Sequence, residues 1–181
     1  MNLETAPASR SLAKTPLTET NVKIETSLGD IEIKLNKEAS PETVSNFLQY
    51  VKEEYYNNTV FHRVISNFMI QGGGYEREGK GKDPRGSIKS EANNGLKNER
   101  GTVAMARTND PNSAKAQFFI NVNNNSFLNH SSKNAGYTVF GKVIEGMNIV
   151  DKIRTTKTTV KNGSKDWPVD EVVMKRVYIK Q

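Results

Sequence analysis

The chain has 181 residues, a net charge of +6, 35% hydrophobic residues and 25% charged residues, which describes one globular domain with a substantial core. No apolar run approaches the roughly 20 residues that cross a bilayer, so we expect no membrane association. Cysteine is absent and histidine occurs only twice, which excludes disulfides and thiol nucleophiles and leaves little material for a bound metal.

The N-terminal residues 1–20 are rich in Thr, Ser, Ala and Pro and have no hydrophobic period. We therefore expect a disordered tail, followed by a single domain over residues 21–181. From Val22 onward apolar and polar residues alternate, and a turn at 27–30 separates two such runs. This pattern predicts a β-hairpin.

Two helices are predicted. Ser40 and Pro41 are typical of a helix start, with serine as N-cap and proline at the first helical position. The residues that follow have the spacing of one apolar helix face, at Val44, Phe47, Leu48 and Val51. A second, shorter helix is predicted over residues 147–154.

The rest of the chain alternates between strand patterns and loops. Strands are predicted at residues 59–65, 68–71, 102–106, 117–122, 138–143 and 171–179. Many short strands with two helices favour an antiparallel sheet closed on itself over a parallel sheet. The long segment between Gly72 and Gly101 is rich in Gly, Asn, Lys and Glu, which is typical of a functional or mobile loop.

Two patterns that resemble other sites are set aside. The segment Gly74–Gly81 spells most of a phosphate-binding loop, but Gly81 stands where a Ser or Thr must hold magnesium. The basic stretch at residues 152–165 contains no aromatic residue to stack on a base, so we interpret it as a solvated loop and expect no specific nucleic-acid binding. Weak, salt-sensitive attraction to polyanions stays open.

The segment Phe61–Gly74 (FHRVISNFMIQGGG) is the most informative part of the chain. In a regular strand Phe61, Arg63 and Ile65 share one face, so the arginine would lie at a rim or in a partly desolvated site. The alternative is an outward arginine in a surface ion pair. A fixed cation and the amide of Gln71 beside apolar side chains suit an apolar ring attached to a backbone amide, and proline is that ring.

A second segment at residues 101–122 (GTVAMARTNDPNSAKAQFFINV) has a similar composition. Strand alternation places Gln117 and Phe119 on one face and Phe118 with Ile120 on the other. One face can therefore line a groove while the opposite face fills the core.

With these two segments the chain resembles the cyclophilin peptidyl-prolyl isomerases, especially their bacterial members, over roughly residues 22–180. The resemblance implies a mainly β fold, a closed eight-stranded antiparallel β-barrel capped by two α-helices. It implies cis-trans isomerisation of X-Pro bonds in peptides and folding proteins, without a cofactor. The implied catalytic residues are Arg63, which donates to the prolyl nitrogen, Gln71 and Phe68. The implied substrate-binding residues are Met69, Ala106, Arg107, Gln117, Phe119, Phe127, Leu128 and Tyr137.

Two positions depart from the best-known eukaryotic pattern of this family. Phe127 stands where those proteins carry a tryptophan, and Tyr137 stands where they carry a histidine. Both changes are typical of bacterial relatives. The loss of the indole N–H implies weak binding of cyclosporin-type ligands.

The same residues leave a second class of function open, a non-catalytic module or chaperone that binds proline-containing chains. In either class the expected partners are proline-containing peptides and unfolded or folding proteins, and we expect a monomer. The segment at residues 127–146 resembles exported bacterial cyclophilins slightly more than cytosolic ones, which favours the periplasm over the cytoplasm by a small margin.

Overall fold

The computed structural model describes residues 19–181, so all but the last two residues of the predicted tail lie outside the described part. The first two strands, β1 (Glu19–Thr26) and β2 (Gly29–Asn36), form the predicted hairpin. Strand β1 begins at Glu19, slightly before the predicted start of the alternating pattern at Val22.

The other predicted elements occur in the predicted order with small shifts in their ends. The helices are α1 (Pro41–Lys52) and α2 (Met147–Arg154), with short 3₁₀ turns η1 (Arg77–Gly79) and η2 (Ser126–Leu128). The other strands are β3 (Thr59–Val60), β4 (Arg63–Ile65), β5 (Met69–Gly72), β6 (Thr102–Met105), β7 (Phe118–Asn121), β8 (Val139–Glu145), β9 (Thr158–Lys161), β10 (Ser164–Pro168) and β11 (Val173–Ile179). Strands β9 and β10 and the two short 3₁₀ turns were not predicted.

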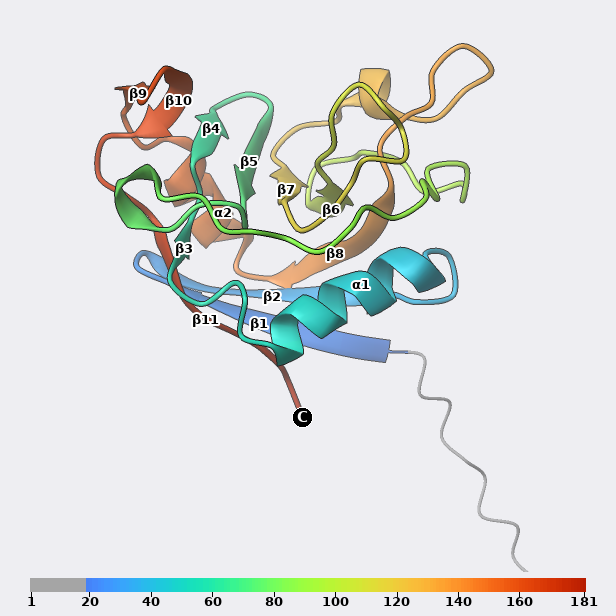
Figure 1. Ribbon diagram of the computed structural model, residues 1–181, viewed down its shortest axis with the longest axis horizontal. Coiled ribbons are helices and arrows are strands. Elements are labelled where there is room, and N and C mark those ends of the chain that lie inside the picture. The colour runs from blue at the N-terminus through green and yellow to red at the C-terminus, as the bar shows by residue number, and fades with distance from the viewer. Residues whose placement is uncertain (1–18) are drawn as a thin grey trace, which may run out of the picture.

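Nine of these strands form one curled antiparallel sheet in the order β3-β11-β1-β2-β8-β6-β7-β5-β4 (Figure 1). It differs in detail from the expected closed barrel of eight strands, because β3 and β4 are its two edges. Only Phe61 and His62 separate these edges along the chain. The predicted single strand at 59–65 divides here, since the chain leaves the β11 edge and joins the β5 edge.

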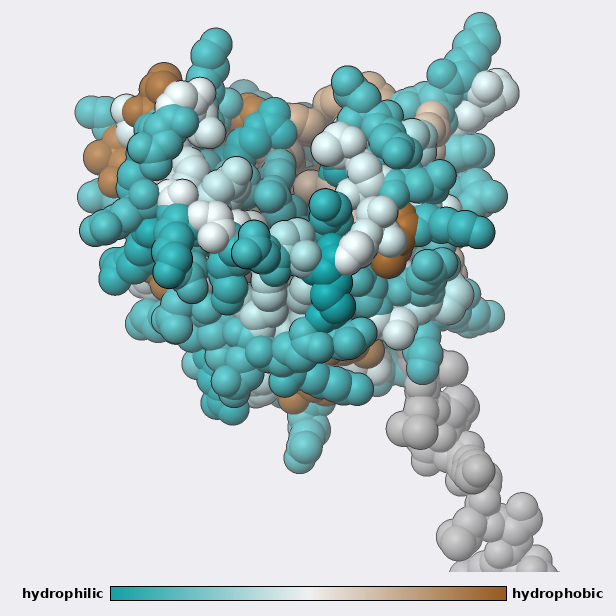
Figure 2. Space-filling model, in the orientation of Figure 1, coloured by the Kyte–Doolittle hydropathy of each residue, from teal (hydrophilic) through white to brown (hydrophobic). Residues whose placement is uncertain are grey.

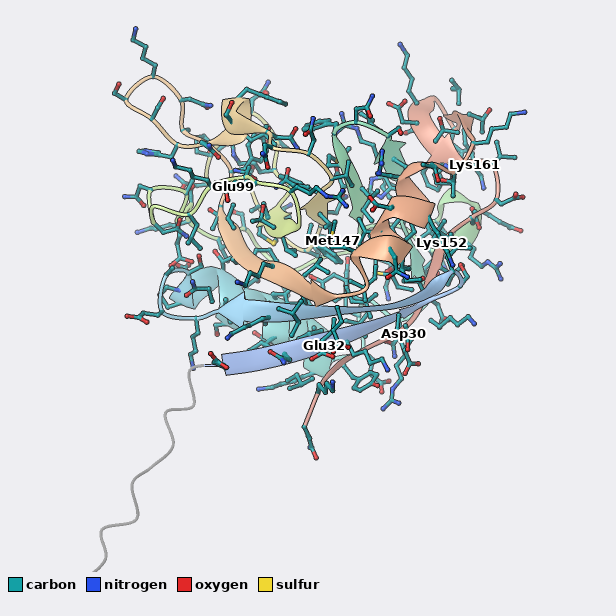
Figure 3. All side chains as sticks on the ribbon, turned by 180° about the vertical axis from the view of Figure 1, so that it is seen from behind. Asp30, Glu32, Glu99, Met147, Lys152 and Lys161 are labelled. Carbon is teal, nitrogen blue, oxygen red and sulfur yellow. The ribbon has the colours of Figure 1, made fainter. Side chains whose placement is uncertain are left out.

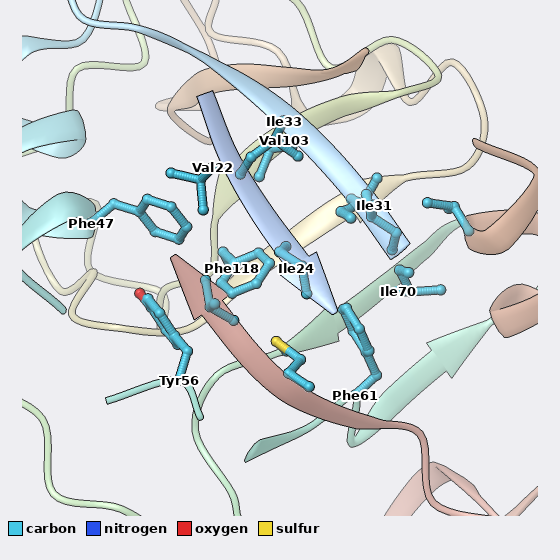
Figure 4. Packing of buried hydrophobic residues seen from close by; sticks show 14 of the residues in the cluster. Val22, Ile24, Ile31, Ile33, Phe47, Tyr56, Phe61, Ile70, Val103 and Phe118 are labelled. Carbon is cyan, nitrogen blue, oxygen red and sulfur yellow. The ribbon is translucent and has the colours of Figure 1, made fainter. Parts of the chain in front are cut away.

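The inner face of the sheet holds the core that the alternating pattern predicted. Val22 and Ile24 of β1 and Ile31 and Ile33 of β2 are all fully buried and pack together with Phe47 of α1 (Figure 4). Burying each such side chain contributes about 1.5–3 kcal/mol. The two helices pack on different parts of the sheet, α1 on β2 and β11 and α2 on β2, β4 and β5.

The predicted start of α1 is confirmed, but the serine does not cap it with its side chain. The hydroxyl of Ser40 donates to the carbonyl of Val139 at 2.8 Å. The cap comes from Glu91, whose carboxylate accepts hydrogen bonds from the backbone N–H of Thr43 at 2.7 Å and of Glu42 at 3.3 Å. A carboxylate here also opposes the positive end of the helix dipole.

The basic stretch at residues 152–165 is more ordered than the predicted solvated loop. It comprises the end of α2 and most of the β9–β10 hairpin. Arg154 pairs with Asp151 at 2.8 Å, and Lys161 pairs with Glu171 at 2.7 Å. Figure 3 shows Lys152 and Lys161 on the face of the molecule opposite to the view of Figure 1.

Most of the surface visible in Figure 2 is hydrophilic, with several separate apolar groups. Figure 2 shows apolar side chains gathered over β9 and β10, where Val160 and Val169 are exposed. None of the helices within residues 19–181 is long and apolar enough to cross a membrane.

Candidate active site

Strands β4, β5 and β7 carry four of the residues that the sequence singled out, Arg63, Met69, Gln71 and Phe119, and the others lie outside these strands. Arg63 begins β4 and is exposed, whereas the next residue, Val64, points into the core. Opposite it on β5 lies Gln71, and Arg63 Nη1 donates to Gln71 Oε1 at 3.4 Å. The antiparallel register therefore places the arginine and the first glutamine side by side.

A second glutamine extends this contact. Gln71 Nε2 donates to Gln117 Oε1 at 2.9 Å, so Arg63, Gln71 and Gln117 form a hydrogen-bonded row. The glycine at position 74 makes room for it, because a Cβ atom there would lie only 2.3 Å from Gln117 Nε2. The run of glycines after β5 is thus needed for close approach of side chains.

A cavity of about 130 Å³ opens beside Arg63. Its other lining residues are Phe68, Met69, Gln71, Ala106, Arg107, Phe119, Leu128 and Tyr137. Behind the cavity, Met69, Ala104, Phe119, Leu128 and Val139 form a cluster separate from the main core. Nine of the eleven residues implied by the resemblance therefore meet at one small cavity.

The strand β7 divides between the two clusters as its alternation predicted. Phe119 lines the cavity, while Phe118 and Ile120 belong to the main core. The same expectation fails for Phe61, which is fully buried in the main core instead of lying on the face of Arg63. The cause is the break between β3 and β4, which interrupts the alternation just before Arg63.

The two remaining residues lie next to the cavity. Gln117 lines a larger neighbouring cavity of about 340 Å³, which shares Gln71, Ala106 and Arg107 with the first. Phe127 lies at the outer edge with 64% of its surface exposed, and its ring lies 5.4 Å from that of Phe68.

Arg107 has a different environment from Arg63. Its guanidinium lies 4.2 Å from the centre of the Tyr137 ring. Its Nη2 and Nε atoms donate to the carbonyl of Gly136 at 2.7 and 3.1 Å. Arg107 is therefore held against Tyr137 on one side of the cavity. Arg63 instead is exposed, so its remaining N–H donors face solvent at the entrance of the cavity.

Sequence reasoning missed the larger cavity. Its further lining residues are Tyr55, Gly74, Tyr75, Gly81, Lys82, Pro84, Thr108, Ser113, Lys115 and Ala116. Most come from the two loops at residues 74–84 and 106–116, and loops carry no periodic signal that would locate a cavity. The length of the segment between Gly72 and Gly101 was the only available indication.

His62, directly before Arg63, is buried with 8% of its surface exposed. Its ring lies 4.7 Å from that of Tyr75 and 5.7 Å from that of Trp167. Burial, and secondarily the charge of Arg63, lower the pKa of His62 from 6.5 to about 4. His62 is therefore neutral at pH 7, and the basic side chains that line the cavity are Arg63 and Arg107. Within residues 19–181 no cluster of three or more metal-binding side chains occurs.

The structure thus combines a curled antiparallel sheet and two helices with an exposed guanidinium beside a small cavity. The family model described as cyclophilin type peptidyl-prolyl cis-trans isomerase/CLD matches residues 21–179, and the chain belongs to this family. The curled β fold with two helices is the cyclophilin fold, and the protein is a peptidyl-prolyl cis-trans isomerase.

Curated relatives agree with this assignment. Peptidyl-prolyl cis-trans isomerase cyp18 of Streptomyces antibioticus is 52% identical, covering 87% of this chain and 97% of the relative. Peptidyl-prolyl cis-trans isomerase B of Escherichia coli (strain K12) is also 52% identical, covering 88% of this chain and 99% of the relative.

Solved structures share the fold at lower identity. A cyclophilin-type isomerase of Cryptosporidium parvum has a TM-score of 0.75 and 29% identity, over 90% of this chain and 98% of the other. A second structure of that protein, in the presence of the dipeptide Ala-Pro, has a TM-score of 0.74 at the same identity and covers 89% of this chain and 99% of the other. The family binds proline-containing peptides.

Proposed function

We propose that the cavity of about 130 Å³ holds the proline ring of the substrate while Arg63 donates a hydrogen bond to the prolyl nitrogen. The observation that carries this proposal is the position of the Arg63 guanidinium at a cavity that Phe68, Met69, Phe119 and Leu128 also line. Nothing has to be protonated, cleaved or oxidised, so the reaction needs no cofactor.

The reaction sets the requirement for this donor. Rotation about a peptide bond has a barrier of about 18–20 kcal/mol, because the twisted amide loses its resonance. In the twisted amide the prolyl nitrogen regains its lone pair and becomes a better hydrogen-bond acceptor. A donor aimed at that nitrogen binds the transition state more tightly than either planar form, which is the condition for catalysis.

Arg63 suits this role because its guanidinium stays charged at any working pH and presents donors in a rigid plane. A hydrogen bond from a charged donor contributes about 1.5–3 kcal/mol, or roughly ten- to 150-fold in rate. Gln71, held by Gln117, limits where the guanidinium can lie. The aromatic ring of Phe119 and the side chains of Met69 and Leu128 hold the proline ring.

The substrate chain extends beyond the proline. The larger cavity adjoins the first at Ala106 and Arg107, so we propose that the residues preceding proline lie along this junction. The clients proposed for this groove are proline-containing segments of unfolded and folding proteins.

The alternative is a chaperone that binds such segments without useful turnover. Mere binding has no need of a cation directed at the mouth of the cavity, so the position of Arg63 favours catalysis. Exchange NMR on an Ala-Pro peptide tests this, because turnover broadens the cis and trans signals.

Arg63→Ala should lower kcat/KM at least tenfold without unfolding the protein. The matched control is Arg176→Ala, since Arg176 is an exposed arginine on β11 stacked on Tyr178. Wild-type turnover in a folded Arg63→Ala variant contradicts the mechanism, and unbroadened signals with the wild-type protein favour the chaperone.

A further inference from the structure

Three asparagines lie buried behind the proposed proline cavity. Asn98, Asn121 and Asn125 have only 1%, 0% and 3% of their surface exposed. A buried amide is unfavourable unless its donors and acceptor find partners. These three side chains, named here the asparagine cluster, find partners in one another, in neighbouring polar side chains and in the backbone.

Asn121, at the end of β7, is the centre of the asparagine cluster. Its Nδ2 atom donates to Asn98 Oδ1 at 3.1 Å and to Thr102 Oγ1 at 3.0 Å. Its Oδ1 atom accepts a hydrogen bond from Asn125 Nδ2 at 2.8 Å. Both donors and the acceptor of this amide are therefore used inside the protein.

The outer two asparagines bind the backbone of cavity-lining residues. Asn125 Nδ2 donates to the carbonyl of Phe68 at 2.9 Å. Asn98 Nδ2 donates to the carbonyl of Leu128 at 3.1 Å and lies 3.4 Å from that of Tyr137. Phe68, Leu128 and Tyr137 all line the cavity of about 130 Å³.

These lining residues come from two segments that are far apart in sequence. Phe68 lies in the turn between β4 and β5, while Leu128 ends η2 and Tyr137 precedes β8. The η2 segment belongs to no strand of the sheet. The asparagine cluster therefore supplies a continuous row of hydrogen bonds from one side of the cavity to the other.

We propose that Asn98, Asn121 and Asn125 are positioning residues that fix the width of the cavity holding the proline ring. This inference rests on the proposed function of that cavity. Dispersion contacts with a small ring weaken steeply when a gap of about 0.5–1 Å opens. A buried, fully satisfied polar network is rigid enough to prevent such a gap.

The test replaces one asparagine at a time by aspartate, which removes the amide donor and keeps the shape of the side chain. Asn98→Asp still accepts the hydrogen bond from Asn121 but presents oxygen to the carbonyls of Leu128 and Tyr137. We expect a KM for an Ala-Pro peptide at least fivefold higher, kcat changed less than twofold, and shifted methyl NMR signals of Leu128. Asn125→Asp, which faces the carbonyl of Phe68, should act in the same direction and provides a second variant if the first does not fold.

Two controls separate positioning from stability. Asn123→Asp changes an exposed asparagine of the same loop and should leave KM unchanged. Val177→Ala removes core volume on β11, away from the cavity, and should lower Tm without raising KM. A folded asparagine variant with wild-type KM and Leu128 signals overturns the inference, and so does an equal rise of KM in Val177→Ala.

Arg63→Ala, measured alongside, separates this inference from the mechanism. Wild-type turnover in Arg63→Ala overturns the proposed donor to the prolyl nitrogen. The inference about the asparagine cluster is tested separately, by the KM for the peptide and the Leu128 NMR signals of the asparagine variants. Neither measurement requires the Arg63 donor.

Discussion

Gln71 stands between Arg63 and Gln117, accepting a hydrogen bond from the guanidinium at 3.4 Å and donating one to the second glutamine at 2.9 Å. The guanidinium is exposed, so few other contacts restrict its position. A long exposed side chain held in one place loses conformational entropy, and a fixed neighbour reduces that loss during the reaction. In the proposed mechanism, the acceptor on Gln71 therefore prepares Arg63 for the twisted amide.

We therefore expect Gln71→Ala to lower kcat/KM about five- to twentyfold, which corresponds to the loss of about 1–2 kcal/mol of transition-state binding. A double-mutant cycle checks the reason. If Gln71 acts through Arg63, the Arg63→Ala/Gln71→Ala double variant is little worse than Arg63→Ala alone. Fully additive losses would show that the two side chains act independently.

Gly74 offers a test of Gln117 that leaves both glutamines in the chain. In Gly74→Ala the new methyl group would lie 2.3 Å from Gln117 Nε2, so the Gln117 side chain must move and release Gln71. We expect a several-fold lower kcat/KM with a small change in Tm, because a flexible side chain can move aside. Gly86→Ala is the matched control, since nothing lies within 4 Å of its added Cβ atom. Equal activity in the two variants would contradict the role of Gln117.

Much of the fold was predictable because burial follows the period of each element. The alternation in β1 and β2 identified their buried faces, and the separation of Phe118 from Phe119 that alternation predicts in β7 holds in the structure. At the site, the residues were named from the family resemblance, and the structure brings Arg63, Gln71 and Phe119 together because β4 pairs with β5 and β5 with β7.

The structural features that the sequence did not predict depend on contacts between residues that are distant in the chain. Ser40 carries the local signal of an N-cap, yet Glu91 caps α1 from 48–49 residues further along the chain. The interruption between β3 and β4 at Phe61 involves Val172, whose carbonyl accepts a hydrogen bond from the Phe61 N–H at 3.0 Å. The asparagine cluster was equally invisible, because Asn98 and Asn125 look like the other polar loop residues until the fold buries them.

The cap on α1 gives a prediction for stability. Glu91→Ala leaves the N–H groups of Glu42 and Thr43 without their acceptor and removes a negative charge from the helix N-terminus. The loss should be about 1–2 kcal/mol, or roughly 2–8 °C in Tm for a domain of this size. Thermal unfolding of Glu91→Ala and Glu91→Gln checks this. Glu91→Gln keeps an acceptor and should lose less; equal losses would argue against capping.

Phe127 gives a prediction for ligand binding. It is 64% exposed at the edge of the cavity and its ring packs at a tilt against that of Phe68, but it offers no hydrogen-bond donor. We expect weak cyclosporin binding to this protein and at least tenfold tighter binding to Phe127→Trp, which adds an indole N–H at that edge. Calorimetric titration of both proteins measures the two affinities. A nanomolar dissociation constant for the unmodified protein would contradict the expectation, while proline turnover should be similar in both.

The buried imidazole of His62 predicts how stability depends on pH. Its pKa is lowered from 6.5 to about 4 in the folded protein, first by burial and then by the charge of Arg63. Between these values the unfolded chain takes up a proton that the folded protein does not, so stability falls as pH decreases from about 6.5 to 4. The loss from this group reaches about 2–3 kcal/mol near the lower limit. Above pH 6.5 it contributes no pH dependence.

Other titrating groups act at lower pH. The pKa of Asp151 is lowered to about 2, mainly by its hydrogen bond from Arg100, and the pKa of Glu32 is also lowered, mainly by its hydrogen bond from Lys180. Their contributions begin to be lost as the pH falls through the ordinary carboxyl pKa values, near 4.5 for Glu32 and 3.8 for Asp151. The difference between the wild-type protein and His62→Gln in the change of Tm from pH 6.5 to 4.5 therefore isolates His62. We expect a drop of several degrees in the wild-type protein and a clearly smaller one in His62→Gln. Trp167, the only tryptophan, lies 5.7 Å from the imidazole ring and reports the transition by its fluorescence. An equal drop in both proteins would show that His62 does not titrate in this window.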